Sequence, residues 1–277
     1  MRAKFIDVAG TQTRVLHEGE GNADVLLLIH GFGSSADTWM HNIDALGQDF
    51  HVIVPDLVGH GFTGSVDLED GPSHPKAVEH LFGVLEVLGI DRFVPCGSSY
   101  GGLLGALMYF DAPDRVAKLI INGSGSTFNT EEQLATALQG TKKNSSIAML
   151  DPTLESCRIR SQGTVYDPAS VPESFVFMRL SIYSQPYIVE AWRNQLDAMM
   201  DRDKMRPYRI YDRLEDIAVE TLVVWGRQDP RGLHAQAVAG VERMPNARLV
   251  TYEECGHLPF LEKPDQYNAD IRAFLAS

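Results

Sequence analysis

Short apolar runs alternate with longer helical patterns along most of this chain, and this alternation constrains the fold more than any other feature. The run from Val25 to Ile29 contains no polar residue, which is typical of a strand covered on both faces. Further strands are expected at Val52–Val54, Arg92–Val94, Leu119–Ile121, Thr221–Trp225 and Leu249–Tyr252. Helices are expected at Pro75–Leu88, Tyr100–Phe110, Leu233–Met244 and Leu261–Leu275. The pattern predicts an α/β fold with a mainly parallel sheet flanked by helices.

Two segments depart from the strand–helix alternation. Residues 4–8 and 13–17 read as strands joined at Ala9-Gly10-Thr11, which predicts an antiparallel hairpin at the edge of the sheet. Residues 129–209 contain helical stretches and several prolines but few strand-like runs, and the strand pattern resumes at Thr221. We therefore expect a helical cap at 129–209, inserted into a core made of residues 1–128 and 210–277.

Composition narrows the class of function. The 277 residues are 44% hydrophobic, so the chain can bury a large core, and its formal net charge of −13 disfavours binding to nucleic acid or to an anionic membrane surface. No apolar run is long enough to span a bilayer, and the N-terminus lacks the apolar region of a secretory signal. Three cysteines cannot build a disulfide framework. These features predict a cytoplasmic protein that acts on a small molecule. Whether the protein forms a homo-oligomer stays open at this point.

The strongest local motif is Gly97-Ser98-Ser99-Tyr100-Gly101, which follows a predicted strand and precedes a predicted helix. In that context Gly-x-Ser-x-Gly is typical of a nucleophile elbow, a strained turn that points a serine hydroxyl into a pocket. Only Ser99 has glycine at both flanking positions of the motif, so Ser99 rather than Ser98 is the candidate nucleophile.

A serine hydroxyl is a weak nucleophile at neutral pH and needs a base that is oriented by a carboxylate. Asp229 follows the strand that ends at Trp225, and His257 follows the last predicted strand. Because the carboxyl ends of parallel strands meet at one edge of a sheet, both should lie near Ser99. The sequence therefore predicts a triad of Ser99, His257 and Asp229.

A second glycine-containing loop follows the first long strand. This loop has the sequence His30-Gly31-Phe32-Gly33-Ser34-Ser35, and one of its backbone N–H groups is expected to face the pocket. The N–H of Phe32 is favoured over that of Gly33. The residue after the nucleophile, Tyr100, opens a helix and would supply the second donor of an oxyanion hole. No metal-ligand spacing is present, so neither a metal nor a cofactor is expected.

Taken together, these motifs resemble the α/β-hydrolases, and in particular their capped esterase, haloperoxidase and carbon–carbon hydrolase members. The resemblance extends over nearly the whole chain and is carried by five segments: HGFGSSADTW, DLVGHGFT, GSSYGG, WGRQDP and CGHLPFLEKP. It implies an α/β-hydrolase fold with an inserted helical cap. Ser99 argues against haloalkane dehalogenases and epoxide hydrolases, because these relatives carry aspartate at the elbow.

The cap segment from Val165 to Glu173, with Met178-Arg179 beyond it, resembles the cap of meta-cleavage-product hydrolases. These enzymes cut a carbon–carbon bond in vinylogous diketo acids, and the resemblance implies that Arg179 holds the substrate carboxylate. Ser98 and Leu258 stand where these hydrolases usually have asparagine and tryptophan. The resemblance implies that both positions face the substrate, with the loop glycines Gly31 and Gly33 beside them.

The sequence thus predicts a cofactor-free serine hydrolase that cleaves either a carbon–carbon bond of a diketo-type compound or a carboxylic ester or lactone. The triad is compatible with both reactions. Two alternatives from other classes stay open: a small-molecule receptor of the hydrolase fold, and a perhydrolase or cofactor-free oxygenase.

Overall fold

The computed structural model describes residues 1–65 and 71–277. In this part of the chain, eight strands form one sheet in the order β1-β2-β4-β3-β5-β6-β7-β8. The strands are β1 (Arg2–Val8), β2 (Thr11–Glu18), β3 (Val25–Ile29), β4 (His51–Pro55), β5 (Val94–Ser98), β6 (Leu119–Asn122), β7 (Thr221–Gly226) and β8 (Ala247–Tyr252).

Strand direction follows the sequence pattern. β1 pairs with β2, and β2 with β4, in antiparallel fashion, whereas all pairs from β4 through β8 are parallel. The apolar strands β3 and β5 lie at the centre of the sheet, where helices cover both faces. The parallel strands therefore deliver the loops that follow β3, β5, β6, β7 and β8 to one edge.

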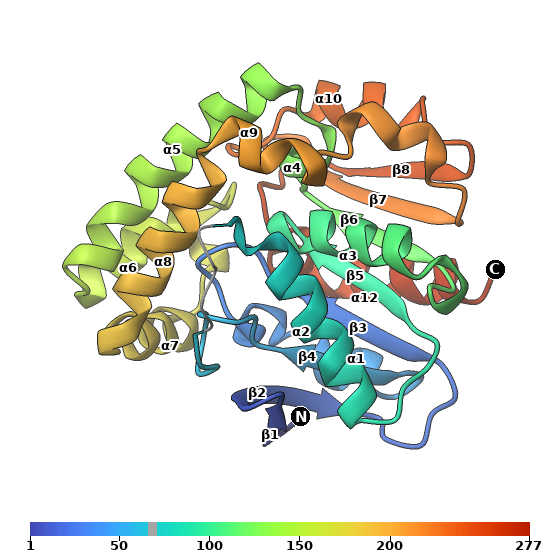
Figure 1. Cartoon of the computed structure of the whole chain (residues 1–277), viewed down its shortest axis with the longest axis horizontal. Helices are drawn as coiled ribbons and strands as arrows, with labels where there is room; N and C mark the ends of the chain where they lie inside the picture. Colours follow the sequence, from blue (N-terminus) through green and yellow to red (C-terminus); the bar gives the residue numbers. More distant parts are fainter. Residues whose placement is uncertain (66–70) are drawn as a thin grey trace.

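Helices surround this sheet on both faces. In Figure 1, α2 and α3 lie in front of the strands, whereas α12 lies behind them. The helices outside the segment between β6 and β7 are α1 (Ile43–Leu46), α2 (Ser73–Val87), α3 (Tyr100–Asp111), α10 (His234–Val241), α11 (Pro259–Glu262) and α12 (Pro264–Leu275). The short 3₁₀ helices here are η1 (Ala36–Trp39) and η2 (Pro113–Arg115). None of the helices in the described part of the chain has both the length and the apolar character needed to cross a membrane.

The segment between β6 and β7, residues 123–220, is entirely described and contains no strand. We call it the helical insert. Its helices are α4 (Gly125–Phe128), α5 (Glu131–Leu150), α6 (Leu154–Gln162), α7 (Glu173–Tyr183), α8 (Pro186–Met199) and α9 (Arg202–Met205), with η3 (Pro168–Ser170), η4 (Arg206–Tyr208) and η5 (Tyr211–Asp216). Helices α5 to α8 stand together at one end of the sheet (Figure 1).

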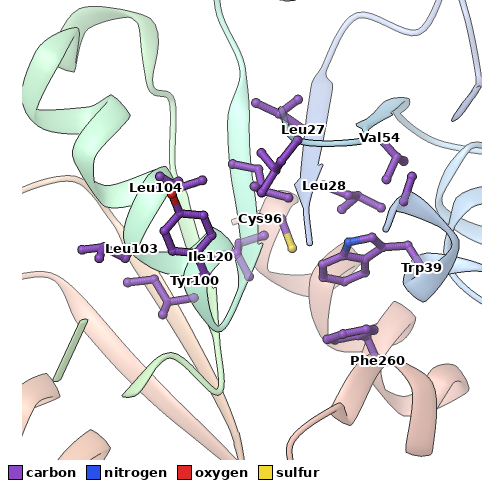
Figure 2. Packing of buried hydrophobic residues seen from close by; sticks show 14 of the residues in the cluster. Leu27, Leu28, Trp39, Val54, Cys96, Tyr100, Leu103, Leu104, Ile120 and Phe260 are labelled. Carbon is purple, nitrogen blue, oxygen red and sulfur yellow. The ribbon is translucent and has the colours of Figure 1, made fainter. Parts of the chain in front are cut away.

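The core is packed on both sides of the central strands. Figure 2 shows Tyr100, Leu103 and Leu104 of α3 on one side, and the ring of Trp39 against Phe260 on the other. These two rings are stacked, with centroids 4.0 Å apart, and both are fully buried. Packing of this kind fixes the elbow between β5 and α3, because both elements are held from opposite faces.

Several element boundaries differ from the sequence expectation by a few residues, and two differ most. The strand expected at Arg92–Val94 begins only at Val94 and continues through Ser98. It is longer at this end because Pro95 pairs with β3, and Gly97 pairs with both β3 and β6. The helix expected at Leu261–Leu275 is interrupted at Lys263, whose φ of −132° and ψ of 55° are not helical. Lys263 precedes Pro264, and a residue before proline is disfavoured in the helical conformation. The hairpin, the parallel sheet and the helical stretch are confirmed.

Candidate active site

The turn between β5 and α3 has the geometry of a nucleophile elbow. Ser99 has a positive φ of 53° with ψ of −116°, a conformation that costs energy for any residue with a side chain. A Cβ at Gly97 would lie 2.0 Å from the Gly101 carbonyl oxygen, and a Cβ at Gly101 would lie 2.3 Å from the Ile29 carbonyl oxygen. Both flanking glycines are therefore required by steric contact, and the backbone N–H of Ser99 is tied to the Asn122 carbonyl at 2.8 Å.

Asp229 and His257 meet at the same edge of the sheet. The imidazole Nδ1 of His257 lies 2.9 and 3.0 Å from the two carboxylate oxygens of Asp229, whose side chain is fully buried. One of these oxygens also accepts the backbone N–H groups of Arg231 at 2.7 Å and Gly232 at 3.2 Å. This pattern fixes the carboxylate and leaves Nε2 of His257 as the ring nitrogen free for proton transfer.

Gly123, at the end of β6, closes the other side of this pair. Its φ is +51°, and a Cβ there would lie 3.0 Å from the His257 carbonyl oxygen and 3.3 Å from both Asp229 Oδ2 and His257 Nδ1. Only a residue without a side chain leaves the Asp229–His257 pair undisturbed at this point.

The loop that carries His257 is held by the half-buried carboxylate of Glu262. Glu262 accepts the backbone N–H of Gly256 at 3.0 Å, that of Leu258 at 3.2 Å and that of Tyr166 at 2.7 Å. Burial raises the pKa of the Glu262 carboxyl, while the three backbone donors favour its charged form. The N–H of His257 itself donates to the carbonyl of Thr164 at 2.8 Å. The histidine loop is thus bonded directly to residues 164–166 of the helical insert.

The loop after β3 and the start of α3 each contribute a residue to the cavity wall. Phe32 and Tyr100 both line the cavity that Ser99 faces, and neither backbone N–H takes part in a turn, loop or cap hydrogen bond in the described residues. The loop is anchored by His30, whose ring lies 2.8 Å from the Gly31 carbonyl through Nδ1 and accepts the Leu57 N–H through Nε2. Burial lowers the pKa of His30 to about 4, so its ring is neutral.

A cavity of about 150 Å³ lies over the elbow and is lined by Ser99, His257, Phe32 and Tyr100. The remaining lining residues include Leu134, Leu138, Thr141, Arg160, Thr164, Met199 and Met205 of the helical insert, together with His74, Leu103 and Arg231. Ser99 and His257 therefore lie just beyond strand ends, whereas much of the rest of the cavity wall comes from the insert.

Five residues expected to bind substrate do not line this cavity: Gly31, Gly33, Ser98, Arg179 and Leu258. Gly31 still lies close to the nucleophile, since a Cβ there would be 3.3 Å from that of Ser99. Ser98 is buried within β5, and Leu258 is buried behind His257.

Arg179 departs most from the sequence expectation. Its side chain is buried and donates to the Tyr183 hydroxyl at 3.2 Å, beside the rings of Phe175 and Tyr183. The helix face that carries Arg179 is buried, but it packs behind the loop at Gly33 rather than against the cavity.

Three polar residues of the cavity wall were not among the site residues predicted from the sequence. Arg160 and Arg231 carry guanidinium groups into the lining, and His74 presents a buried ring that is stacked on Tyr208 with centroids 5.6 Å apart. Burial lowers the pKa of His74 to about 3, so this ring is neutral. In residues 1–65 and 71–277, no group of three or more histidine, cysteine, aspartate or glutamate side chains could hold a metal ion.

This arrangement defines a class of protein, a serine hydrolase built on a parallel sheet with a strained elbow. A family profile described as the alpha/beta hydrolase family matches residues 26–270, and the chain therefore belongs to that family.

Named relatives are similar over nearly the whole length. A 2-hydroxy-6-oxononadienedioate/2-hydroxy-6-oxononatrienedioate hydrolase from Burkholderia vietnamiensis is 30% identical over 99% of this chain and 95% of its own. A pimeloyl-[acyl-carrier protein] methyl ester esterase from Pectobacterium carotovorum is 28% identical over 93% of this chain and 96% of its own. A solved structure of the meta-cleavage product hydrolase CumD from Pseudomonas fluorescens IP01 has a TM-score of 0.80, with 27% identity over 99% and 97% of the two chains. The α/β-hydrolase fold and the hydrolase class predicted from the sequence are confirmed.

Proposed function

We propose that this enzyme hydrolyses a carbon–carbon bond next to a ketone in a small diketo acid, using Ser99, His257 and Asp229. The observation that carries the proposal is one cavity in which Ser99 and His257 face the same space while Asp229 is bonded to His257 Nδ1. The hydrolases of 2-hydroxy-6-oxo-dienedioates and meta-cleavage products among the relatives favour this bond over others.

In the first half of the reaction, the Ser99 hydroxyl oxygen attacks the ketone carbon and its proton passes to His257 Nε2. The resulting oxyanion accepts hydrogen bonds from the N–H groups of Phe32 and Tyr100, the latter at the start of the 12-residue helix α3. The carbon–carbon bond then breaks, and the departing carbon takes the proton from His257. A neighbouring carbonyl in the substrate stabilises the electron pair that this carbon receives.

In the second half, water attacks the acyl-Ser99 carbonyl and gives a proton to His257. The tetrahedral intermediate collapses, His257 returns the proton to the Ser99 oxygen, and the carboxylic acid leaves. The sum is one water consumed, one carbon–carbon bond broken and two products formed, with no change in the enzyme. Asp229 orients His257 and stabilises its charged form throughout.

We also propose that the helical insert acts as a cap, with the core in residues 1–128 and 210–277 and the cap at 129–209. This division is supported by the cavity wall, to which α5, α6, α8 and α9 contribute side chains. A wall of this kind excludes water from the acyl-enzyme until the first product has left.

Ester hydrolysis is the second candidate, because a methyl ester esterase is 28% identical to this chain and the same groups would perform it. The two reactions are separated by comparing kcat/KM on a 2-hydroxy-6-oxo-dienedioate, followed by loss of its conjugated chromophore, with kcat/KM on an aryl ester of similar size. A higher value on the aryl ester would reject carbon–carbon hydrolysis as the main activity.

The triad is tested by Ser99→Ala, for which loss of a triad member predicts a fall in kcat of about 10³ or more with unchanged thermal unfolding. A phosphonylating reagent should label the wild-type chain once, on the peptide that contains Ser99. Retention of more than a tenth of kcat in Ser99→Ala, or labelling at Ser98, would overturn the assignment.

A further inference from the structure

Two arginines line the cavity that Ser99 and His257 share. Arg160 comes from α6 of the helical insert and Arg231 from the loop after β7, two residues beyond Asp229. In the described part of the chain, neither guanidinium lies within ion-pair distance of an aspartate or glutamate, although the chain has 37 acidic residues against 24 lysines and arginines. An arginine removed from water without a carboxylate partner is expensive, and its retention requires an explanation.

The hydrogen bonds of these arginines leave most of their donors unused. Arg160 is buried and donates from Nε to the Tyr183 hydroxyl at 2.8 Å and from Nη2 to the Gly33 carbonyl at 3.5 Å. The half-buried guanidinium of Arg231 forms no hydrogen bond with any residue that the structure describes. Since each guanidinium has five N–H donors, several donors of these two cavity-lining residues have no acceptor among the residues that the structure describes.

The two groups also lie close enough to repel each other. Burial, the charge of Arg160 and that of the more distant Arg179 all lower the pKa of Arg231, and Asp229 opposes them only in part. Asp229 is not the missing partner, because its carboxylate pairs with His257 and the Arg231 guanidinium lies beyond ion-pair distance of it. Two unpaired like charges at one wall of a cavity are typical of a site that an anion completes.

We propose that Arg160 and Arg231 form the subsite that binds a carboxylate group of the substrate beside the Ser99 nucleophile. This inference rests on the proposed function and names the substrate class: a carbonyl compound that carries a carboxylate. A carboxylate fits because its planar pair of oxygens matches the fork of a guanidinium. Arg179 then acts as a positioning residue, since it and Arg160 share the Tyr183 hydroxyl.

The binding test uses glutarate as the probe and Ser99→Ala protein, so that the result does not depend on turnover. Calorimetry should detect glutarate binding, and adding Arg231→Gln should weaken it about 10- to 150-fold, the range that corresponds to one lost charged hydrogen bond. The matched control is Arg227→Gln, in the same loop, whose side chain is exposed and pairs with Glu253 outside the cavity. This control should bind glutarate as the parent does.

The kinetic test compares a neutral aryl butyrate with the aryl monoester of glutaric acid in the otherwise wild-type enzyme. Arg231→Gln should lower kcat/KM about 10- to 150-fold on the acidic ester and by less than about twofold on the neutral one. Arg231→Lys keeps the charge but not the fork, and should recover part of the loss. Arg160→Gln should repeat the pattern, with thermal unfolding measured because Arg160 is buried.

Three results would overturn the subsite. The first is the absence of glutarate binding, and the second is equal glutarate affinity in Arg231→Gln and Arg227→Gln. The third is that inorganic phosphate binds instead of glutarate and that its binding is weakened by Arg231→Gln to the same extent. Failure of the proposed function looks different, because kcat/KM would then be higher on the aryl ester than on the 2-hydroxy-6-oxo-dienedioate, whatever the glutarate result.

Discussion

Gly123 offers a sharp test of how the Asp229–His257 pair is held. In Gly123→Ala the new Cβ would lie 3.0 Å from the His257 carbonyl oxygen and 3.3 Å from His257 Nδ1, so the loop must shift by a few tenths of an ångström. The positive φ of +51° adds about 1–2 kcal/mol of backbone strain. A displacement of about 1 Å in a catalytic group costs about 10²-fold in rate, and we expect about a 10-fold fall in kcat for this smaller shift.

The matched control is Gly89→Ala. Gly89 also has a positive φ, +69°, but a Cβ there meets no atom within 4 Å, and the residue is not part of the cavity. Urea unfolding should show a similar loss of about 1–2 kcal/mol in both variants, because both adopt the left-handed conformation. Steady-state kinetics should separate them, with kcat lowered only in Gly123→Ala. Equal kcat values in the two variants would refute the argument that glycine is necessary at position 123 because of contact with Asp229 and His257 rather than because of backbone strain.

Two further predictions concern stability. Burial lowers the pKa of His30 to about 4 and those of His60 and His74 to about 3, so the unfolded chain binds protons below pH 6.5 that the folded chain does not. Each of these three histidines should therefore lower the unfolding free energy by up to about 1.4 kcal/mol per pH unit as the pH falls from 6.5 toward 4. Urea titrations with equal midpoints at pH 7 and pH 5 would contradict this expectation. Glu262→Gln should lower the unfolding free energy by about 1–3 kcal/mol and also lower kcat, because one amide oxygen cannot accept from three backbone N–H groups. Unchanged unfolding and kinetics would rule out a role of Glu262 in holding the histidine loop.

The sequence predicted what local patterns determine. The parallel sheet follows from apolar runs such as Val25 to Ile29, and the elbow at Ser99 follows from two glycines that steric contact requires. Asp229 and His257 could be predicted because parallel strands bring their following loops to one edge, where the structure places both residues. Their catalytic roles remain predictions.

What the sequence could not predict depends on contacts between distant segments. Whether Arg179 on the buried face of α7 reaches the cavity depends on Tyr183 and Gly33, since the Tyr183 hydroxyl donates to the Gly33 carbonyl at 2.6 Å. Arg160 belongs to a helix with a weak apolar pattern and Arg231 to a loop, so neither carries a periodic signal. The end of β5 was missed because Pro95 and Gly97 are poor strand formers that pair only once their neighbours are in place.

The division of the cavity wall has a consequence for how such a protein can diversify. Ser99 and His257 lie just beyond strand ends. Leu134, Leu138, Met199 and Met205 belong to the insert and also line a second cavity between α5, α8 and α9. Unbranched methionine side chains change shape at little cost. Replacements among these four residues can therefore admit or reject new molecules while the elements that position Ser99 keep their structure. Selection for a new substrate and retention of the old chemistry then act on different parts of one gene.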